Sequence, residues 1–109
     1  MLNRKEISEI FDIPYATLYG WKNGESGNGR QKLYYFLSFQ DKKEIEKRFQ
    51  SNEKKVSAYR VSHLFGFNEK LMGRWKKSKP KLYKFLTSFT REEIEKKLNG
   101  IKELGLIEH

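Results

Sequence analysis

Apolar residues along this chain recur at intervals of three and four positions, with charged and polar residues between them. This spacing places the apolar side chains on one face of an α-helix, so we expect an all-α protein. In the first half of the chain, helices are expected near residues 4–11 and 15–23, and then around Leu33–Leu37 and Ile45–Phe49.

The second half of the chain repeats the first. Trp21-Lys22 matches Trp75-Lys76, and Lys32–Leu37 matches Lys81–Leu86. Over the two aligned blocks 13 of 34 positions are identical, which indicates a duplication rather than chance similarity. The corresponding helices of the second half are expected near 57–65 and 69–77, and then around Leu82–Leu86 and Ile94–Leu98.

The duplication predicts two tandem four-helix repeats, residues 1–54 and 55–109, the second ending in a helical tail. Units of about fifty residues are only marginally stable on their own, because so small a body buries too little of its unfolded surface. We therefore expect the two repeats to pack together rather than to move independently.

Short-range signals predict where several helices begin and end. Asp41-Lys-Lys-Glu44 and Thr90-Arg-Glu-Glu93 have the pattern of capping boxes. Ser78-Lys-Pro80 offers a cap residue followed by a proline for the first turn. Asn99-Gly100 is expected to end the last helix. The amphipathic segment Ile101–Ile107 would then pack on the body or form a homodimer with another chain.

The first repeat contains a glycine-rich segment, residues 23–29, that the second lacks. One alternative is that this segment and Leu33–Phe36 form a β-hairpin wing. The second repeat has Pro80 near the matching place and no such loop, which favours a helix in both repeats.

The first two helices of each repeat have the pattern of a helix-turn-helix. That motif needs five apolar positions at fixed intervals, a small residue where the helices touch, and often glycine in the turn. In the second repeat Ser62 is the small residue, Gly66 lies in the turn and Asn68 caps the second helix. The apolar positions are Val61, Phe65, Phe67, Met72 and Trp75.

The first repeat fits the same pattern. Ser8 is its small residue, and Asp12, which tolerates a left-handed turn, takes the place of the glycine. The apolar positions are Ile7, Phe11, Ile13, Leu18 and Trp21. Trp21 and Trp75 are expected in the core, because the last apolar position of the motif is a packing position.

The segment Ile13-Pro-Tyr-Ala-Thr-Leu-Tyr-Gly-Trp-Lys-Asn-Gly24 resembles the recognition helix of phage-repressor, Cro-like and transposase-type helix-turn-helix regulators. The resemblance covers the helix pair of each repeat and no more of the chain. It implies sequence-specific binding of double-stranded DNA, with the second helix of the pair in the major groove.

The charge of the chain adds to this expectation. The net charge is +9 and the pI is about 9.7, as is typical of nucleic-acid-binding proteins. Residues 1–54 carry ten Lys/Arg against eight Asp/Glu, whereas residues 55–109 carry thirteen against six. No acidic residue occurs between Lys70 and Arg91. We therefore expect the second repeat to do most of the DNA binding.

Candidate DNA contacts follow from position, since the N-terminal residues of a recognition helix lie nearest the base edges. In the second repeat, side chains suited to base edges are Asn68, Glu69, Lys70 and Arg74. Lysines suited to phosphates are Lys76, Lys77, Lys79 and Lys81. In the first repeat, the candidates for contacts with thymine methyls and phosphates are Tyr15, Ala16, Thr17 and Tyr19. The candidates for contacts with the DNA backbone are Lys22 and Asn23.

Other function classes have less support. The chain has no cysteine, and its histidines are His63 and His109, so we expect no enzyme, metal site or cofactor. The alternative function is a protein-interaction or assembly module that docks a partner through an aromatic surface formed by Tyr15, Tyr19, Tyr34, Tyr35 and Tyr59. The N-terminus lacks the apolar run of a signal peptide, and no stretch approaches the roughly 20 apolar residues of a membrane span. We therefore expect a cytoplasmic, nucleoid-associated protein.

Overall fold

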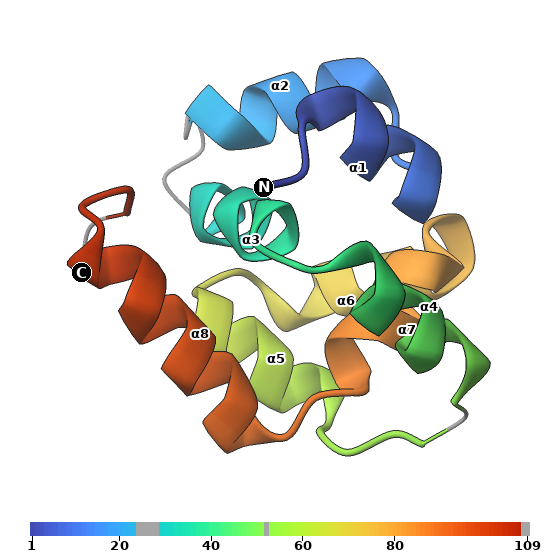
Figure 1. Cartoon of the computed structure of the whole chain (residues 1–109). Helices are drawn as coiled ribbons and strands as arrows, with labels where there is room; N and C mark the ends of the chain where they lie inside the picture. Colours follow the sequence, from blue (N-terminus) through green and yellow to red (C-terminus); the bar gives the residue numbers. More distant parts are fainter. Residues whose placement is uncertain (24–28, 52, 108–109) are drawn as a thin grey trace.

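The structure is a computed structural model that describes residues 1–23, 29–51 and 53–107. Within these ranges all regular secondary structure is helical, so the predicted all-α class is confirmed (Figure 1). The helices are α1 (Arg4–Phe11), α2 (Tyr15–Asn23), α3 (Arg30–Ser38), α4 (Lys42–Gln50), α5 (Ala58–Phe65), α6 (Glu69–Ser78), α7 (Pro80–Thr87) and α8 (Arg91–Glu103). None of these helices is long and apolar enough to span a membrane.

Several helix ends lie where the sequence predicts them. Thr90 and Glu93 form a reciprocal capping box at the start of α8, and Pro80 begins α7. Asp12 and Gly66 end α1 and α5 in the left-handed region, at φ 55° and 89°. These positions could be predicted because each depends on residues close in sequence.

Two predictions about N-caps were wrong. The Asp41 side chain accepts no capping hydrogen bond at the start of α4, and Glu44 is engaged by Arg48 instead of reaching back to Asp41. Ser78 is the last residue of α6, where its hydroxyl donates to the Arg74 carbonyl, so Lys79 precedes α7. In each case a side chain that the capping motif requires is bonded elsewhere: Glu44 pairs with Arg48, and the Ser78 hydroxyl bonds to the Arg74 carbonyl.

The prediction that α8 ends at Asn99-Gly100 was also wrong, because the helix continues to Glu103. Leu98 and Ile101 are both buried and lie one turn apart. Glycine inside a helix costs about 1 kcal/mol, whereas burying a large aliphatic side chain contributes about 1.5–3 kcal/mol. Ile107 is buried as well, so the C-terminal segment packs on the body of its own chain.

The β-hairpin wing is not present at Leu33–Phe36, which lies within α3. Residues 24–28 of the glycine-rich segment lie outside the described residues.

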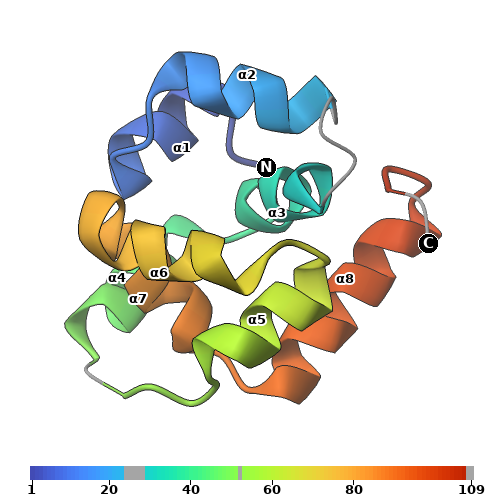
Figure 2. The same ribbon diagram turned by 180° about the vertical axis from the view of Figure 1, so that it is seen from behind.

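The third and fourth helices are exchanged between the two halves of the chain. Figures 1 and 2 show α3 beside α8, and α7 beside α4. By the sequence alignment α3 corresponds to α7, and α4 corresponds to α8. Each third helix therefore packs against the fourth helix of the other half.

Phenylalanine rings of the core follow the same exchange. Phe11 packs on Phe85 with ring centroids 5.1 Å apart, and its counterpart Phe65 packs on Phe36 at 5.2 Å. Phe36 and Phe85, which are themselves counterparts, lie 6.5 Å apart. Contacts between counterparts are those expected around an approximate two-fold axis. Residues 1–54 and 55–109 thus share one hydrophobic core.

Arg48 joins the two halves by polar contacts. Its guanidinium donates to Glu44 on its own helix and to Glu93 on α8, and it lies 3.6 Å from the centroid of the Phe89 ring. It also donates to the Ser88 carbonyl. The Arg48 side chain is only 13% exposed, so these contacts are largely shielded from solvent.

The Glu93 carboxylate should make the stability of the protein depend on pH. The backbone N–H of Thr90, and then the charge of Arg48, hold the pKa of Glu93 below its usual range. A depressed pKa contributes stability above the unfolded-state value near 4.5, and that stability is lost as the pH falls through the folded-state value. We therefore expect Glu93→Gln to lower the urea midpoint at pH 7 and to lose this effect near pH 3.

Glu92→Gln is the matched control for this titration, because Glu92 is an exposed neighbour on the same turn. Its midpoint should follow that of the wild type at both pH values. If Glu93→Gln lowered the urea midpoint equally at pH 7 and pH 3, the charge of Glu93 would not be the source of its contribution to stability.

Candidate nucleic-acid interface

The two helix pairs predicted from the motif are built around the expected apolar positions. All five positions are buried in each pair, from Ile7 to Trp21 and from Val61 to Trp75. The small residue of the first pair, Ser8, donates its hydroxyl to the Ile13 carbonyl. We call the α1–α2 pair the first head and the α5–α6 pair the second head.

The outward face of α6 carries the strongest positive charge on the second head. Asn68 caps the helix by accepting from the Lys70 N–H at 2.9 Å. Lys70, Arg74 and Lys77 are exposed, and none forms an ion pair with any described residue. Glu69 is also exposed, in the first turn of the helix, where the helix dipole favours a negative charge.

Gly73 lies between these cations on the exposed side of α6. No atom lies within 4 Å of the place where a Cβ would be, so this part of the helix surface is open. The absence of a side chain there lets a ligand approach the helix backbone closely. Leu71 and Met72 lie on the buried side of α6, so its exposed cations are confined to one face of the helix.

The remaining candidate lysines of the second half differ in their surroundings. Lys76 is exposed and lies 5.9 Å from the centroid of the Tyr83 ring. Lys79 is half-buried at the junction of α6 and α7. Lys81 forms an ion pair with Asp12 of the first head, with an N–O distance of 3.0 Å. Lys81 is therefore less available to a phosphate than the sequence suggests.

The first head presents an aromatic face rather than a basic one. Tyr15 and Tyr19 are 52% and 55% exposed on α2, and Ala16 beside them is exposed while Thr17 is half-buried. The Arg4 guanidinium lies over both tyrosine rings, 4.7 Å and 4.9 Å from their centroids.

No motif or charge pattern in the sequence points to Arg4. It belongs to α1, eleven residues before Tyr15, and only the crossing of the two helices brings them together. Its Nε is buried and has no hydrogen-bond partner among the described residues. Lys22 and Asn23, the candidates for contacts with the DNA backbone, are exposed in the last turn of α2. They lie at the opposite end of this helix from Tyr15, which Arg4 contacts.

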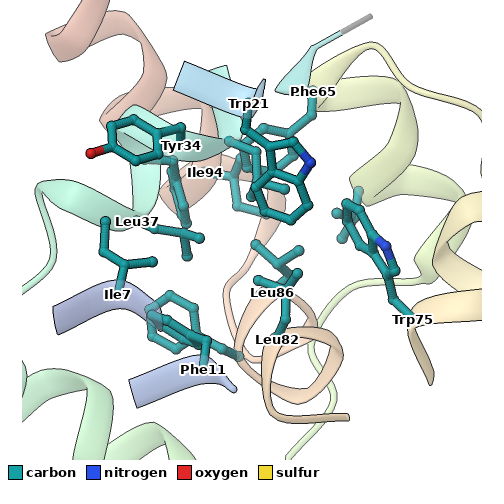
Figure 3. Packing of buried hydrophobic residues seen from close by; sticks show 14 of the residues in the cluster. Ile7, Phe11, Trp21, Tyr34, Leu37, Phe65, Trp75, Leu82, Leu86 and Ile94 are labelled. Carbon is teal, nitrogen blue, oxygen red and sulfur yellow. The ribbon is translucent and has the colours of Figure 1, made fainter. Parts of the chain in front are cut away.

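The two tryptophans lie in the core, as predicted. Trp21 is 6% exposed and Trp75 is 3% exposed. Their ring centroids are 5.4 Å apart with an interplanar angle of 42°, and Figure 3 shows the two indoles approaching each other. Helices α2 and α6 thus meet through two buried tryptophans, one from each helix.

The described residues contain no group of three or more His, Cys, Asp and Glu that could hold a metal ion. His63 packs against the Tyr59 ring, with 4.5 Å between ring centroids.

Comparison of the chain with protein-family models, with curated proteins and with solved structures found no match.

Proposed function

We propose that this protein binds double-stranded DNA sequence-specifically through the second head, as a transcriptional regulator or a mobile-element accessory factor. The observation that carries the proposal is the outward face of α6. Lys70, Arg74 and Lys77 lie there unpaired with any described residue, on the second helix of a closely packed pair. A helix fits the major groove, where arginine and lysine address guanine and asparagine addresses adenine.

The residues of this face differ in the role that each would have. Asn68 and Arg74 have the side chains suited to base edges, with Lys70 beside them at the start of the helix. Lys76 and Lys77, on the last turns of α6, are suited to phosphates, which hold the protein in register without conveying sequence. Association with the nucleoid, in a cytoplasmic protein, follows from the same proposal.

Arg74 and Lys77 should respond differently to substitution. We expect Arg74→Ala to cost about 1–3 kcal/mol on the preferred site and to relax base preference at one position. Lys77→Ala should weaken binding to all sequences about equally and reduce the salt slope by about 1. The measurement is selection of sites from random duplex DNA, followed by gel shifts of the selected site at two salt concentrations.

Lys43→Ala is the matched control, because Lys43 is an exposed lysine of α4 outside both heads. It should leave affinity and salt slope unchanged. If selection enriches no site, and heparin competes as well as any duplex, specific DNA binding is excluded.

A second candidate function is protein docking by the first head. Arg4, held between two exposed tyrosine rings and unpaired with any described carboxylate, has the composition of a protein-binding hot spot and suits a carboxylate-bearing partner. Affinity for such a partner would lack the steep salt dependence and the base preference of duplex binding.

A homodimer through the C-terminal segment stays a prediction, but the burial of its apolar residues does not favour it. With Ile101 and Ile107 buried in their own chain, the exposed apolar residues left near this end are Leu104 and Phe39.

A further inference from the structure

The two heads pack against each other through their inner faces, and this limits how one duplex can contact them. Building on the DNA binding proposed above, we infer that a duplex is read by the second head alone, at a single ungapped and asymmetric site. The first head remains outside the groove, with its α2 face directed away from the bound DNA.

The distance between the heads is the first reason. Regulators that place two recognition helices in successive major grooves hold them about 34 Å apart. Here the indoles of α2 and α6 lie 5.4 Å apart, and the whole chain extends only 32 × 27 × 27 Å. The two recognition helices of one chain cannot therefore reach two half-sites one helical turn apart.

The direction of the two reading faces is the second reason. Successive residues of a helix are turned by about 100°, so Lys70 and Lys77 project about 140° and 200° from Trp75 around α6. By the same count Tyr19 projects about 200° from Trp21 around α2. Since the two tryptophans meet, the exposed faces of α2 and α6 are turned away from each other. They cannot both enter one groove.

The chemistry of the two faces is the third reason. At the positions that Lys70 and Arg74 occupy in α6, the alignment places Ala16 and Gly20 in α2. Among the exposed residues of α2, only Lys22 carries a charge. The outward face of α2 therefore lacks the two cations that α6 carries at Lys70 and Arg74. Lys22 and its counterpart Lys76 are lysines in both helices and provide a matched pair for a test.

The test compares Lys22→Ala with Lys76→Ala, two exposed lysines at the same position of the two heads. On the selected duplex we expect Lys76→Ala to reduce the salt slope by about 1 and to weaken binding several-fold at low salt. Lys22→Ala should leave both unchanged. Circular dichroism and urea unfolding of both variants should match the wild type, since both side chains are exposed.

Site selection and stoichiometry complete the experiment. The selected sequences should align on one short motif without internal symmetry, and sedimentation should show one chain per duplex. A gapped or inverted-repeat motif, two duplexes or two chains in the complex, or equal effects of the two lysine variants would overturn the inference while DNA binding stands. If no sequence is enriched at all, the proposed function fails, and the inference fails with it.

Discussion

Replacing Gly29 by alanine should destabilise the protein by about 3 kcal/mol or more, because two penalties add at this position. Gly29 precedes α3 with φ 83°, a left-handed conformation that costs an L-residue roughly 1–2 kcal/mol. A Cβ added there would also overlap the Phe65 carbonyl group. This neighbour is backbone at the end of α5 and cannot move aside like a side chain.

Gly66→Ala is the matched control for Gly29→Ala. Gly66 has a similar φ of 89°, but no atom lies within 4 Å of its added Cβ. Gly66→Ala should lower the free energy of unfolding only by the cost of the left-handed conformation, about 1–2 kcal/mol. Urea unfolding followed by tryptophan fluorescence measures both variants. Equal losses would show that the close approach of Gly29 to Phe65 does not contribute to stability.

Phe85→Ala should have a comparable or larger effect, with a loss of about 3–5 kcal/mol in the free energy of unfolding. Phe85 is fully buried and packs on four other rings, those of Phe11, Phe36, Phe49 and Phe89. Domains of this size are stable by about 5–15 kcal/mol. The loss should therefore bring the variant close to unfolding at 37 °C.

The matched control is Phe39→Ala, because Phe39 is 38% exposed just after α3. This substitution should lower the free energy of unfolding by less than about 1 kcal/mol. Both halves contribute rings to the cluster around Phe85, so Phe85→Ala should still unfold in one transition. A second transition at higher urea, with one half still folded, would contradict the shared core.

Several features of the fold could be predicted because they depend on residues close in sequence. The expected helices at 4–11 and 15–23 coincide with α1 and α2. The left-handed residues Asp12 and Gly66 and the cap at Asn68 lie where the motif requires them. The burial of Trp21 and Trp75 followed from their places in the repeated pattern. Spacing along one helix is enough to show which of its faces is apolar.

Spacing does not show which apolar face meets which. The exchange of α4 and α8, the guanidinium of Arg48 between the halves, and the position of Arg4 over two tyrosine rings all join residues distant in sequence. The capping box predicted at Asp41 also fails, because Glu44 pairs with Arg48, and the Arg48 guanidinium is itself held by Ser88 and Glu93 of the other half. Competition among partners is decided only when the whole chain has packed.

By itself, the sequence determined that the chain is helical and duplicated and that the cations gather in the second half, because composition and periodicity are local properties. Only the tertiary structure decided that the two heads meet at Trp21 and Trp75 with their exposed faces turned apart. The physical reason is that side chains buried at the same centre must share one core, and that shared core sets the distance and direction between the surfaces outside it.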